Sequence, residues 1–323
     1  MSNNKNGLNV LVDGGAGYLG SILIECLLNR SEELGISKVY CYDNLLYKQD
    51  GIFHFANNPK FEFVYGDVRD YETLQKYLDI ADVVFPLSAL VGMPSCKKNP
   101  KMAEEVNHMH VKYVANNCNF GTKVIYCHTN SCYKSGSSEL IDETGEIEPL
   151  SHYGRTKQAA EDEILKQNFI SLRLATVFGT SYRFRKDLLV NDMTLRAATD
   201  RFVVLFEQHA KRNYIHVRDV VACLIKMMID FDKYRGQVFN VGLSENYSKL
   251  ELCQKIKQYV PEFVIKNDEY TSDPDKRNYI ISNVKLNDTG FFPRYSLDDG
   301  IKELLRAYPI LINSAHFTAY TNL

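Results

Sequence analysis

The feature that most constrains this chain is a glycine-rich turn between a short apolar strand and an amphipathic helix. Val10-Leu11-Val12 runs into Gly14-Gly15-Ala16-Gly17-Tyr18-Leu19-Gly20, and apolar side chains then recur at helical spacing up to residue 29. Glycines allow the sharp turn and let the backbone approach a pyrophosphate, which the free N–H groups of a helix N-terminus stabilise. The pattern predicts a dinucleotide site with contacts from Gly14, Gly17, Tyr18 and Leu19.

The alternation of strands and helices continues as far as Gly179. Further strands are predicted at 39–42, 61–65, 81–89, 123–127 and 170–175, and helices at 101–118 and 153–166. Such alternation is typical of a parallel sheet with helices on both faces. We therefore expect an α/β fold, a Rossmann doubly wound parallel sheet accompanied by a smaller mixed α/β domain.

The length of 323 residues favours about two domains. The pattern is irregular over 180–214, and then a helix at 217–230 and a strand at 238–241 are predicted. We expect residues 1–179, with 215–243 returning to them, to form the dinucleotide-binding domain. Residues 180–214 and 244–323 are expected to form the substrate domain.

Composition excludes several classes of protein. Lys and Arg number 38 against 40 Asp and Glu, so the net charge of -2 argues against binding nucleic acid through bulk positive charge. No apolar run reaches the roughly 18 residues of a membrane span, and the first residues form no apolar signal segment. The eight cysteines contain no C-x-x-C pair, which favours free thiols in a cytoplasmic protein. No metal site is expected.

The identity of the dinucleotide depends on Asp43. This residue ends the second predicted strand, after the last glycine of the turn. A carboxylate there can accept both hydroxyls of the adenosine ribose and would repel a 2′-phosphate. We therefore expect NAD in preference to NADP, the alternative being that Asp43 only caps a turn or helix.

Tyr153 and Lys157 lie four residues apart at the start of a predicted helix and so share one face. An ammonium group beside a phenol favours the phenolate, whose pKa is about 10 when unperturbed. Tyr153 could then take a proton from a substrate alcohol. Alone, this Tyr–Lys spacing is weak evidence for a catalytic pair, because the chain has 21 tyrosines.

In combination, these motifs resemble the extended short-chain dehydrogenase/reductase family, the NAD-dependent nucleotide-sugar epimerases and dehydratases. Gly14, Gly17 and Gly20 match the family's G-x-x-G-x-x-G. By this resemblance, Asp67 and Val68 hold the adenine. The remaining residues on the coenzyme side are Asn44, the loop residues Leu87, Ser88 and Ala89, and Asn107, which supports the site.

The same resemblance assigns the catalytic residues. Thr129 lies four residues before Tyr133, where the family has its Ser or Thr, and is expected to hydrogen-bond the reacting hydroxyl. Tyr153 is the expected base, and Lys157 also binds the nicotinamide ribose. Two positions depart from the family pattern, since Asp13 stands in place of the usual Thr and Lys134 in place of Gly.

On the substrate side, the resemblance implies four contacts to a nucleotide-diphosphate sugar. They are Thr176, Asn191, Arg212 and Arg277. Guanidinium groups suit a diphosphate because they can bond it bidentately, the alternative being that both arginines are solvated surface residues. The basic and aromatic stretch 182–186 also fits a nucleotide or diphosphate contact better than nucleic acid.

The two residues directly after Thr129 limit which of the family's reactions the chain is expected to catalyse. Asn130 and Ser131 occupy the positions of the Asp-Glu pair of family 4,6-dehydratases, and Ser131 also stands where 3,5-epimerases have Cys. These residues argue against dehydration and 3,5-epimerisation, so the expected reaction is oxidation of the sugar at C4. The chain is also similar to bacterial GDP-heptose 4-dehydrogenases of capsule synthesis. The alternatives are a 4-epimerase and a non-catalytic NAD-binding sensor or scaffold. The family usually dimerises through the helices near 100–118 and 153–167, so a homodimer or higher homo-oligomer is expected.

Overall fold

A seven-stranded parallel sheet forms the larger part of the molecule. The computed structural model describes residues 7–136, 139–268 and 278–314. The strands have the order β11-β7-β5-β4-β1-β2-β3, so the direction in which strands are added reverses between β1 and β4. Their bounds are β1 Leu8–Asp13, β2 Ile36–Asp43, β3 Phe61–Tyr65, β4 Val83–Pro86, β5 Lys123–Thr129, β7 Ile170–Leu174 and β11 Val238–Val241. The expected doubly wound α/β fold is confirmed.

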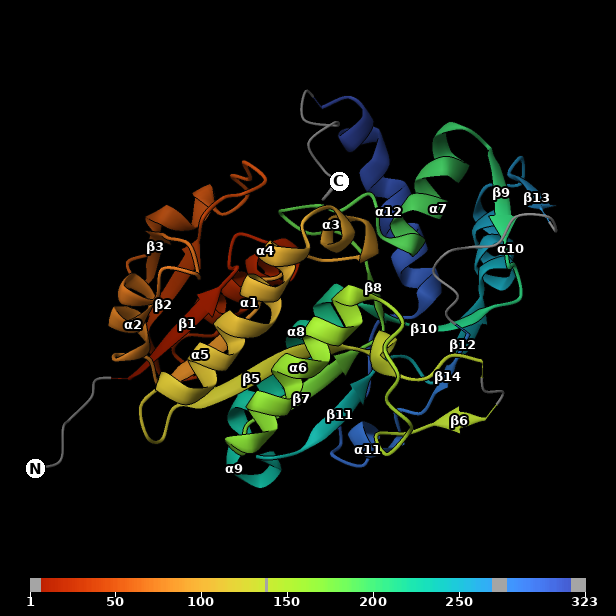
Figure 1. Cartoon of the computed structure of the whole chain (residues 1–323). Coiled ribbons are helices and arrows are strands. Elements are labelled where there is room, and N and C mark those ends of the chain that lie inside the picture. The colour runs from red at the N-terminus through yellow and green to blue at the C-terminus, as the bar shows by residue number, and fades with distance from the viewer. Residues whose placement is uncertain (1–6, 137–138, 269–277, 315–323) are drawn as a thin grey trace, which may run out of the picture.

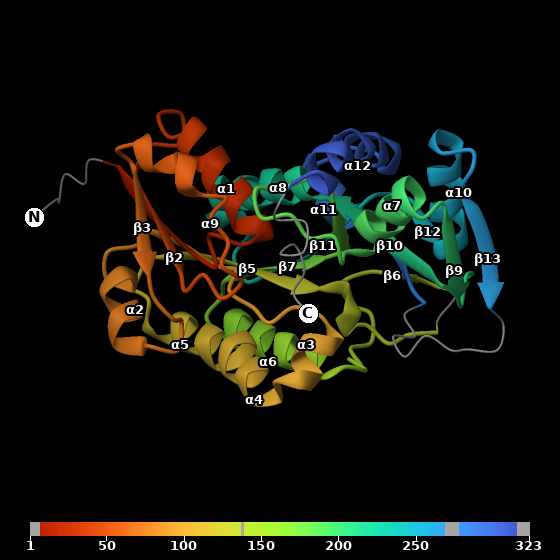
Figure 2. The same cartoon turned by 90° about the horizontal axis from the view of Figure 1, so that it is seen from above.

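Helices cover both faces of this sheet (Figures 1 and 2). One face carries α2 Tyr71–Leu78, α3 Met93–Lys98, α4 Pro100–Glu104, α5 His110–Asn117 and α6 His152–Lys166. The other carries α1 Tyr18–Asn29, α8 Val217–Ile229, α9 Phe231–Tyr234 and α11 Val284–Asn287. Because the central strands are buried on both sides, they are continuous apolar runs rather than alternating ones.

The helix predicted over 101–118 is interrupted. A π-helical turn at Glu105–Met109 separates α4 from α5. Such turns are frequent at functional sites. This one carries Asn107, whose side-chain amide bonds both backbone groups of Leu90.

The smaller part combines three helices with short strands. The helices are α7 Leu189–Thr199, α10 Lys249–Tyr259 and α12 Leu297–Ile312. The strands are β8 Thr176–Phe178, β10 Lys211–His216 and β12 Asn246–Ser248 in one sheet, β9 Phe202–Phe206 beside β13 Val264–Asp268, and β6 Leu140–Ile141 beside β14 Ile280–Ile281. Single 3₁₀ turns lie at Phe53–Asn57 and Asn130–Cys132.

Each part has its own hydrophobic core. The second core gathers side chains such as Tyr214, Phe263 and Leu304. Leu286 and Phe291, expected in the smaller part, pack instead into the core of the large sheet, because α11 lies against β11. Within the described ranges, no helix is both long and apolar enough to cross a membrane.

Candidate functional site

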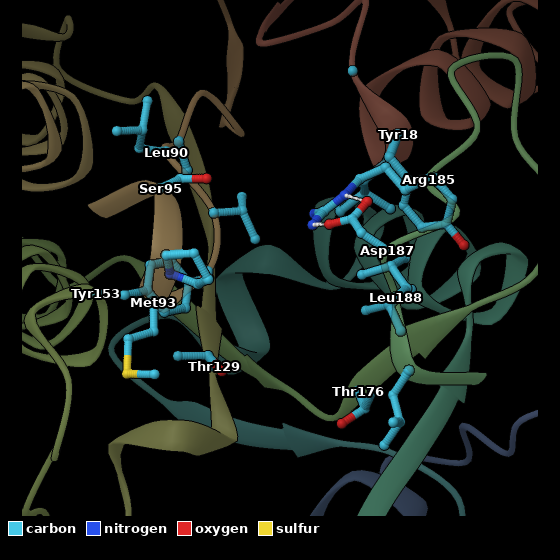
Figure 3. Close-up of a pocket in the computed structure, with 18 of the residues that line it drawn as sticks. Tyr18, Leu90, Met93, Ser95, Thr129, Tyr153, Thr176, Arg185, Asp187 and Leu188 are labelled. Atoms are coloured by element: carbon cyan, nitrogen blue, oxygen red, sulfur yellow. Dashed lines mark hydrogen bonds and ion pairs between the residues drawn. The ribbon is translucent and has the colours of Figure 1, made fainter. Parts of the chain in front are cut away.

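A cavity of about 1040 Å³ lies at the carboxyl ends of the sheet strands, where the strand order reverses. Ligands of open α/β sheets bind at this point because the loops diverge there. The glycine turn and the ends of β2, β4 and β5 line the cavity. Residues of β8, α7 and β9 line it as well. In Figure 3, Tyr18 lies on the same side as Thr176 and Leu188.

The glycine turn is too tight for side chains. Gly14 has φ +65°, and a Cβ added there would lie 2.7 Å from the backbone nitrogen of Ser88. A Cβ on Gly20 would lie 2.5 Å from the carbonyl oxygen of Gly14. Among the residues that the structure describes, no side chain caps α1, whose N-cap is Gly17, so its first N–H groups are available to an anion.

Asp43 ties the glycine turn to the loop after β2. Its Oδ2 accepts a hydrogen bond from the Ala16 N–H at 3.0 Å, and its Oδ1 accepts one from the Leu45 N–H at 2.8 Å and one from Gln49 Nε2 at 3.2 Å. Burial raises the pKa of the carboxyl group, and these N–H donors oppose that effect. The side chain still lines the cavity.

The other residues expected on the coenzyme side are close neighbours. Asn44 Nδ2 donates to Asp67 Oδ2 at 3.1 Å. Hydrogen bonds to the Arg69 side chain, the largest influence, lower the pKa of Asp67 to about 2. The expected residues that line the cavity together are Gly14, Gly17, Tyr18, Leu19, Asp43, Asn44, Asp67, Val68, Leu87, Ser88 and Ala89.

The departure at Asp13 has a structural explanation. Asp13 is fully buried beneath the glycine turn, and its Oδ1 accepts a hydrogen bond from the Ser88 N–H at 2.8 Å. Its Oδ2 lies 3.2 Å from His110 Nε2, a partner on α5. The pair joins the turn, the loop after β4 and α5, a link that sequence spacing does not reveal.

Asn107 supports the site without lining the cavity. Its Oδ1 accepts a hydrogen bond from the Leu90 N–H at 2.8 Å, and its Nδ2 donates to the Leu90 carbonyl at 3.0 Å. The same amide contacts Thr156 Oγ1 at 3.3 Å. Asn107 thereby positions the loop after β4 against α6.

Thr129, Tyr153 and Lys157 all line this cavity. Ser151 Oγ caps α6 by accepting a hydrogen bond from the Gly154 N–H at 3.0 Å, which places Tyr153 in the first turn of the helix. Thr129 ends β5, and its hydroxyl donates to Ser131 Oγ at 3.0 Å. Figure 3 shows Tyr153 and Thr129 on one side of the cavity, with Thr176 and Leu188 opposite.

Lys157 is buried one helical turn below Tyr153. Its ammonium nitrogen lies 4.1 Å from the ring centroid of Tyr126, a cation–π contact. Burial lowers the pKa of Lys157 to about 8, although nearby acidic groups oppose the effect. The lysine can therefore exchange a proton near neutral pH.

A buried polar network lies behind β5 and was not predicted. Glu161 Oε2 accepts a hydrogen bond from Arg173 Nη2 at 2.6 Å, and its Oε1 accepts one from Ser171 Oγ at 2.6 Å. His128 Nε2 lies 3.0 Å from Gln158 Oε1, and burial lowers the pKa of His128 to about 4. The network fixes α6 against β5 and β7, and the helical spacing of Glu161 from Lys157 is its signal in the sequence.

Not all of the residues expected to contact the substrate line the cavity. Thr176 and Arg212 line the cavity. Asn191 does not: it is fully buried, its Oδ1 accepts from the Gly179 N–H at 3.1 Å, and its Nδ2 donates to the Arg185 carbonyl at 2.8 Å. Its amide shapes the backbone instead of facing a ligand. Arg277 lies outside the described residues.

Four further cationic side chains line the cavity, and two of them belong to the basic stretch that the sequence predicted near a nucleotide or diphosphate. They are Arg183, Arg185, Arg196 and Lys249. Arg183 and Arg185 belong to the basic stretch 182–186, and both are buried. Their position in the cavity results from the packing of this stretch across α1, which periodicity cannot predict.

Comparison with known proteins gives a consistent result. The profile of the NAD dependent epimerase/dehydratase family matches residues 10–242. The chain is 26% identical over 316 residues to the low-salt glycan biosynthesis protein Agl12 of Haloferax volcanii, covering 93% of this chain and 98% of that protein. It is 23% identical over 336 residues to CDP-paratose 2-epimerase of Salmonella typhi, covering 92% and 98%.

A solved structure has the same fold. UDP-glucuronic acid 4-epimerase from Bacillus cereus, in complex with UDP-glucuronic acid and NAD, superposes with a TM-score of 0.82 at 22% identity. The match covers 94% of this chain and 100% of that one. Both parts of the molecule are therefore shared with that protein.

Proposed function

The chain belongs to the NAD dependent epimerase/dehydratase family, and from that premise we propose that it oxidises the C4 hydroxyl of a nucleotide-diphosphate sugar to a 4-keto sugar. The protein is an enzyme and its coenzyme is NAD. The observation that carries the proposal is that Thr129, Tyr153 and Lys157 line the same cavity as the glycine turn and Asp43.

The residues present fit the coenzyme. The glycine turn leaves no room for a Cβ, and the uncapped start of α1 suits a diphosphate. Asp43 suits the adenosine ribose, because a carboxylate oxygen has lone pairs beyond those used by the backbone. When bound, NAD⁺ supplies the acceptor for the hydride that leaves C4.

The chain's own residues move the proton. Tyr153 Oη takes the proton of the C4 hydroxyl, while Thr129 Oγ1 hydrogen-bonds the same hydroxyl and orients it. The Lys157 ammonium favours the phenolate form of Tyr153. Tyr153 later returns the proton if the ketone is reduced again.

Two outcomes are open to the oxidised sugar. Asn130 and Ser131 offer no carboxyl group where a 4,6-dehydratase needs one, which argues against loss of water. The first candidate is a 4-dehydrogenase that releases the 4-keto product of a GDP-heptose-like sugar. The second is a 4-epimerase, in which a retained coenzyme returns its hydride to the other face of C4.

An isotope experiment separates these candidates. The protein is incubated with NAD⁺ and GDP-, UDP-, CDP- or dTDP-sugars that carry deuterium at C4. A dehydrogenase would transfer deuterium to the nicotinamide and accumulate NADH and a ketone, whereas an epimerase would retain deuterium at an inverted C4 without net NADH. If no sugar in the panel is oxidised or inverted, the proposal is wrong.

The Tyr153→Phe variant is the matched control. It keeps the ring and loses the hydroxyl, so we expect turnover to fall by about 10²- to 10⁴-fold while NAD binding persists. Full activity in this variant would remove Tyr153 from the role of base.

A further inference from the structure

The segment that leaves β8 crosses the start of α1. Residues 179–188, named here the crossing segment, connect β8 to α7. The Tyr18 hydroxyl donates to the Gly179 carbonyl at 2.7 Å, and Ser181 Oγ donates to the Tyr18 carbonyl at 2.6 Å. The crossing segment therefore lies directly over the helix end at which the glycine turn finishes.

The crossing segment also packs against the loop after β2. The Tyr182 ring lies 4.5 Å from the ring of His54, and its hydroxyl donates to the Glu25 carboxylate of α1. A Cβ on Gly51 would lie 2.4 Å from the Tyr182 carbonyl oxygen, so the two backbones are in contact. Together, these contacts hold the crossing segment against α1 and the loop after β2.

Two arginines of the crossing segment face inward. Arg183 is 3% exposed, and its guanidinium lies 4.8 Å from the ring centroid of Tyr47. Arg185 is 8% exposed, and its Nε donates to Asp187 Oδ1 at 3.2 Å. Both line the cavity. Arg185 also donates through Nη2 to Asp187 Oδ2 at 2.5 Å, so this carboxylate pairs with it. A guanidinium group has five N–H donors, and those that Arg185 does not give to Asp187 suit the oxygens of a diphosphate.

Their location distinguishes the two diphosphates that the cavity would hold. Arg185 lies beside Tyr18, the first residue of α1 (Figure 3). Arg183 contacts Tyr47, whose N–H donates to Gln49, and Gln49 in turn donates to Asp43. Both arginines therefore lie at the glycine-turn end of the cavity.

A separate cationic group lies at the other end. Lys249 Nζ donates to the Phe206 carbonyl at 3.0 Å, and Arg212 lies on the neighbouring strand β10. Both line the cavity near β9. The substrate's diphosphate therefore has its own candidate cations and does not require the crossing segment.

We propose that Arg183 and Arg185 bind the diphosphate of NAD together with the glycine turn, so that the crossing segment holds the coenzyme in place. This inference rests on the coenzyme position proposed above. The coenzyme then leaves only when the crossing segment separates from α1, which makes NAD a retained group.

Ligand binding tests the inference without measuring turnover. The full chain, freed of nucleotide, is titrated with NADH, ADP and adenosine, and the NADH dissociation rate is measured by displacement. Arg183→Gln and Arg185→Gln should each weaken NADH and ADP binding by about 10- to 100-fold, because each removes hydrogen bonds to a charged group. Adenosine lacks the diphosphate, so its affinity should stay within about twofold, and NADH should dissociate faster.

Matched variants make the result specific. Arg235→Gln removes an exposed arginine and should leave all three affinities unchanged. Arg212→Gln should weaken GDP or UDP but not NADH. If a glutamine variant fails to fold by circular dichroism, Arg183→Lys and Arg185→Lys keep the charge and lose the planar fork, and ADP binding should still weaken.

Two results would overturn the inference. One is wild-type ADP affinity in the folded Arg183 and Arg185 variants. The other is that these variants lose affinity for GDP or UDP alone, which would assign the arginines to the substrate. If the wild-type chain binds neither NADH nor ADP, the coenzyme site on which the proposed function depends is itself wrong, and this inference fails with it.

Discussion

At the scale of single residues, chemistry depends on where charges are buried. Lys157, on the same helix as Tyr153, is buried against Tyr126 of β5, and Asp43 is held by backbone N–H groups at the end of β2. Both side chains are desolvated, which costs stability but strengthens their interactions inside the cavity. Function and stability therefore oppose each other at these positions.

Replacing Lys157 by Met should stabilise the protein while abolishing turnover. Lys157 has a pKa of about 8 when folded and about 10.4 when unfolded, so the folded state binds fewer protons between these values and stability rises with pH there. At pH 7, the buried charge costs about 1–3 kcal/mol, which the variant regains. Urea unfolding at pH 7 and pH 9.5 should show the gain shrinking at the higher pH; a gain independent of pH would contradict this.

Replacing Asp43 by Asn should weaken the preference for NAD over NADP. The amide no longer repels a 2′-phosphate, and it is a poorer acceptor for the ribose hydroxyls. We expect NAD affinity to fall by about tenfold, the loss of roughly one charged hydrogen bond. Titration with both coenzymes measures the ratio, and an unchanged ratio would remove Asp43 from this role.

At the scale of elements, α12 joins the crossing segment to the end of β10. Glu303 of α12 accepts hydrogen bonds from the Thr180 N–H at 2.7 Å and its hydroxyl at 2.5 Å, and lies 3.2 Å from His216 Nε2. Burial alone would raise the pKa of Glu303, but these partners outweigh it and lower the pKa to about 2. The helix thereby fixes the crossing segment at Thr180.

Glu303→Gln should therefore lower stability in a pH-dependent way. The carboxylate's contribution is fully present above the unfolded pKa of about 4.3 and is lost as the pH falls toward 2. At pH 7, we expect a loss of about 1.5–3 kcal/mol in the free energy of unfolding. Thermal melts from pH 7 to pH 3 should show the two proteins converging; a constant difference would contradict the role.

At the scale of the whole molecule, the site needs both parts of the chain. The large part provides the glycine turn, Tyr153 and Lys157, while β8, α7 and β9 provide further lining of the same cavity. The helices α4, α5 and α6 share one outer face of the large part (Figure 2). We propose that this face forms a homodimer.

Light scattering after gel filtration tests the dimer. Met109, 42% exposed between α4 and α5, should lie in the interface, so Met109→Asp should give monomers because a buried unpaired charge is costly. Ile229 lies at the end of α8 on the opposite face and is similarly exposed, so Ile229→Asp should leave the dimer intact. A monomeric wild-type chain would refute the proposal.

The local units of this protein were determined by the sequence alone. The helix predicted from residue 18 to 29 is α1 with the same bounds, and Tyr153 and Lys157 line the same cavity because helical spacing places them on one face of α6. Backbone periodicity and glycine sterics act over a few residues, so they can be recognised without a structure. Tertiary structure alone decided which distant segments meet: Asp13 with His110, Glu303 with Thr180, and the crossing segment with the glycine turn. The tertiary structure also decided that the Asn191 side chain bonds the backbone of Gly179 and Arg185 instead of a ligand. Such contacts depend on how elements pack across the whole chain, and local sequence spacing does not encode that packing.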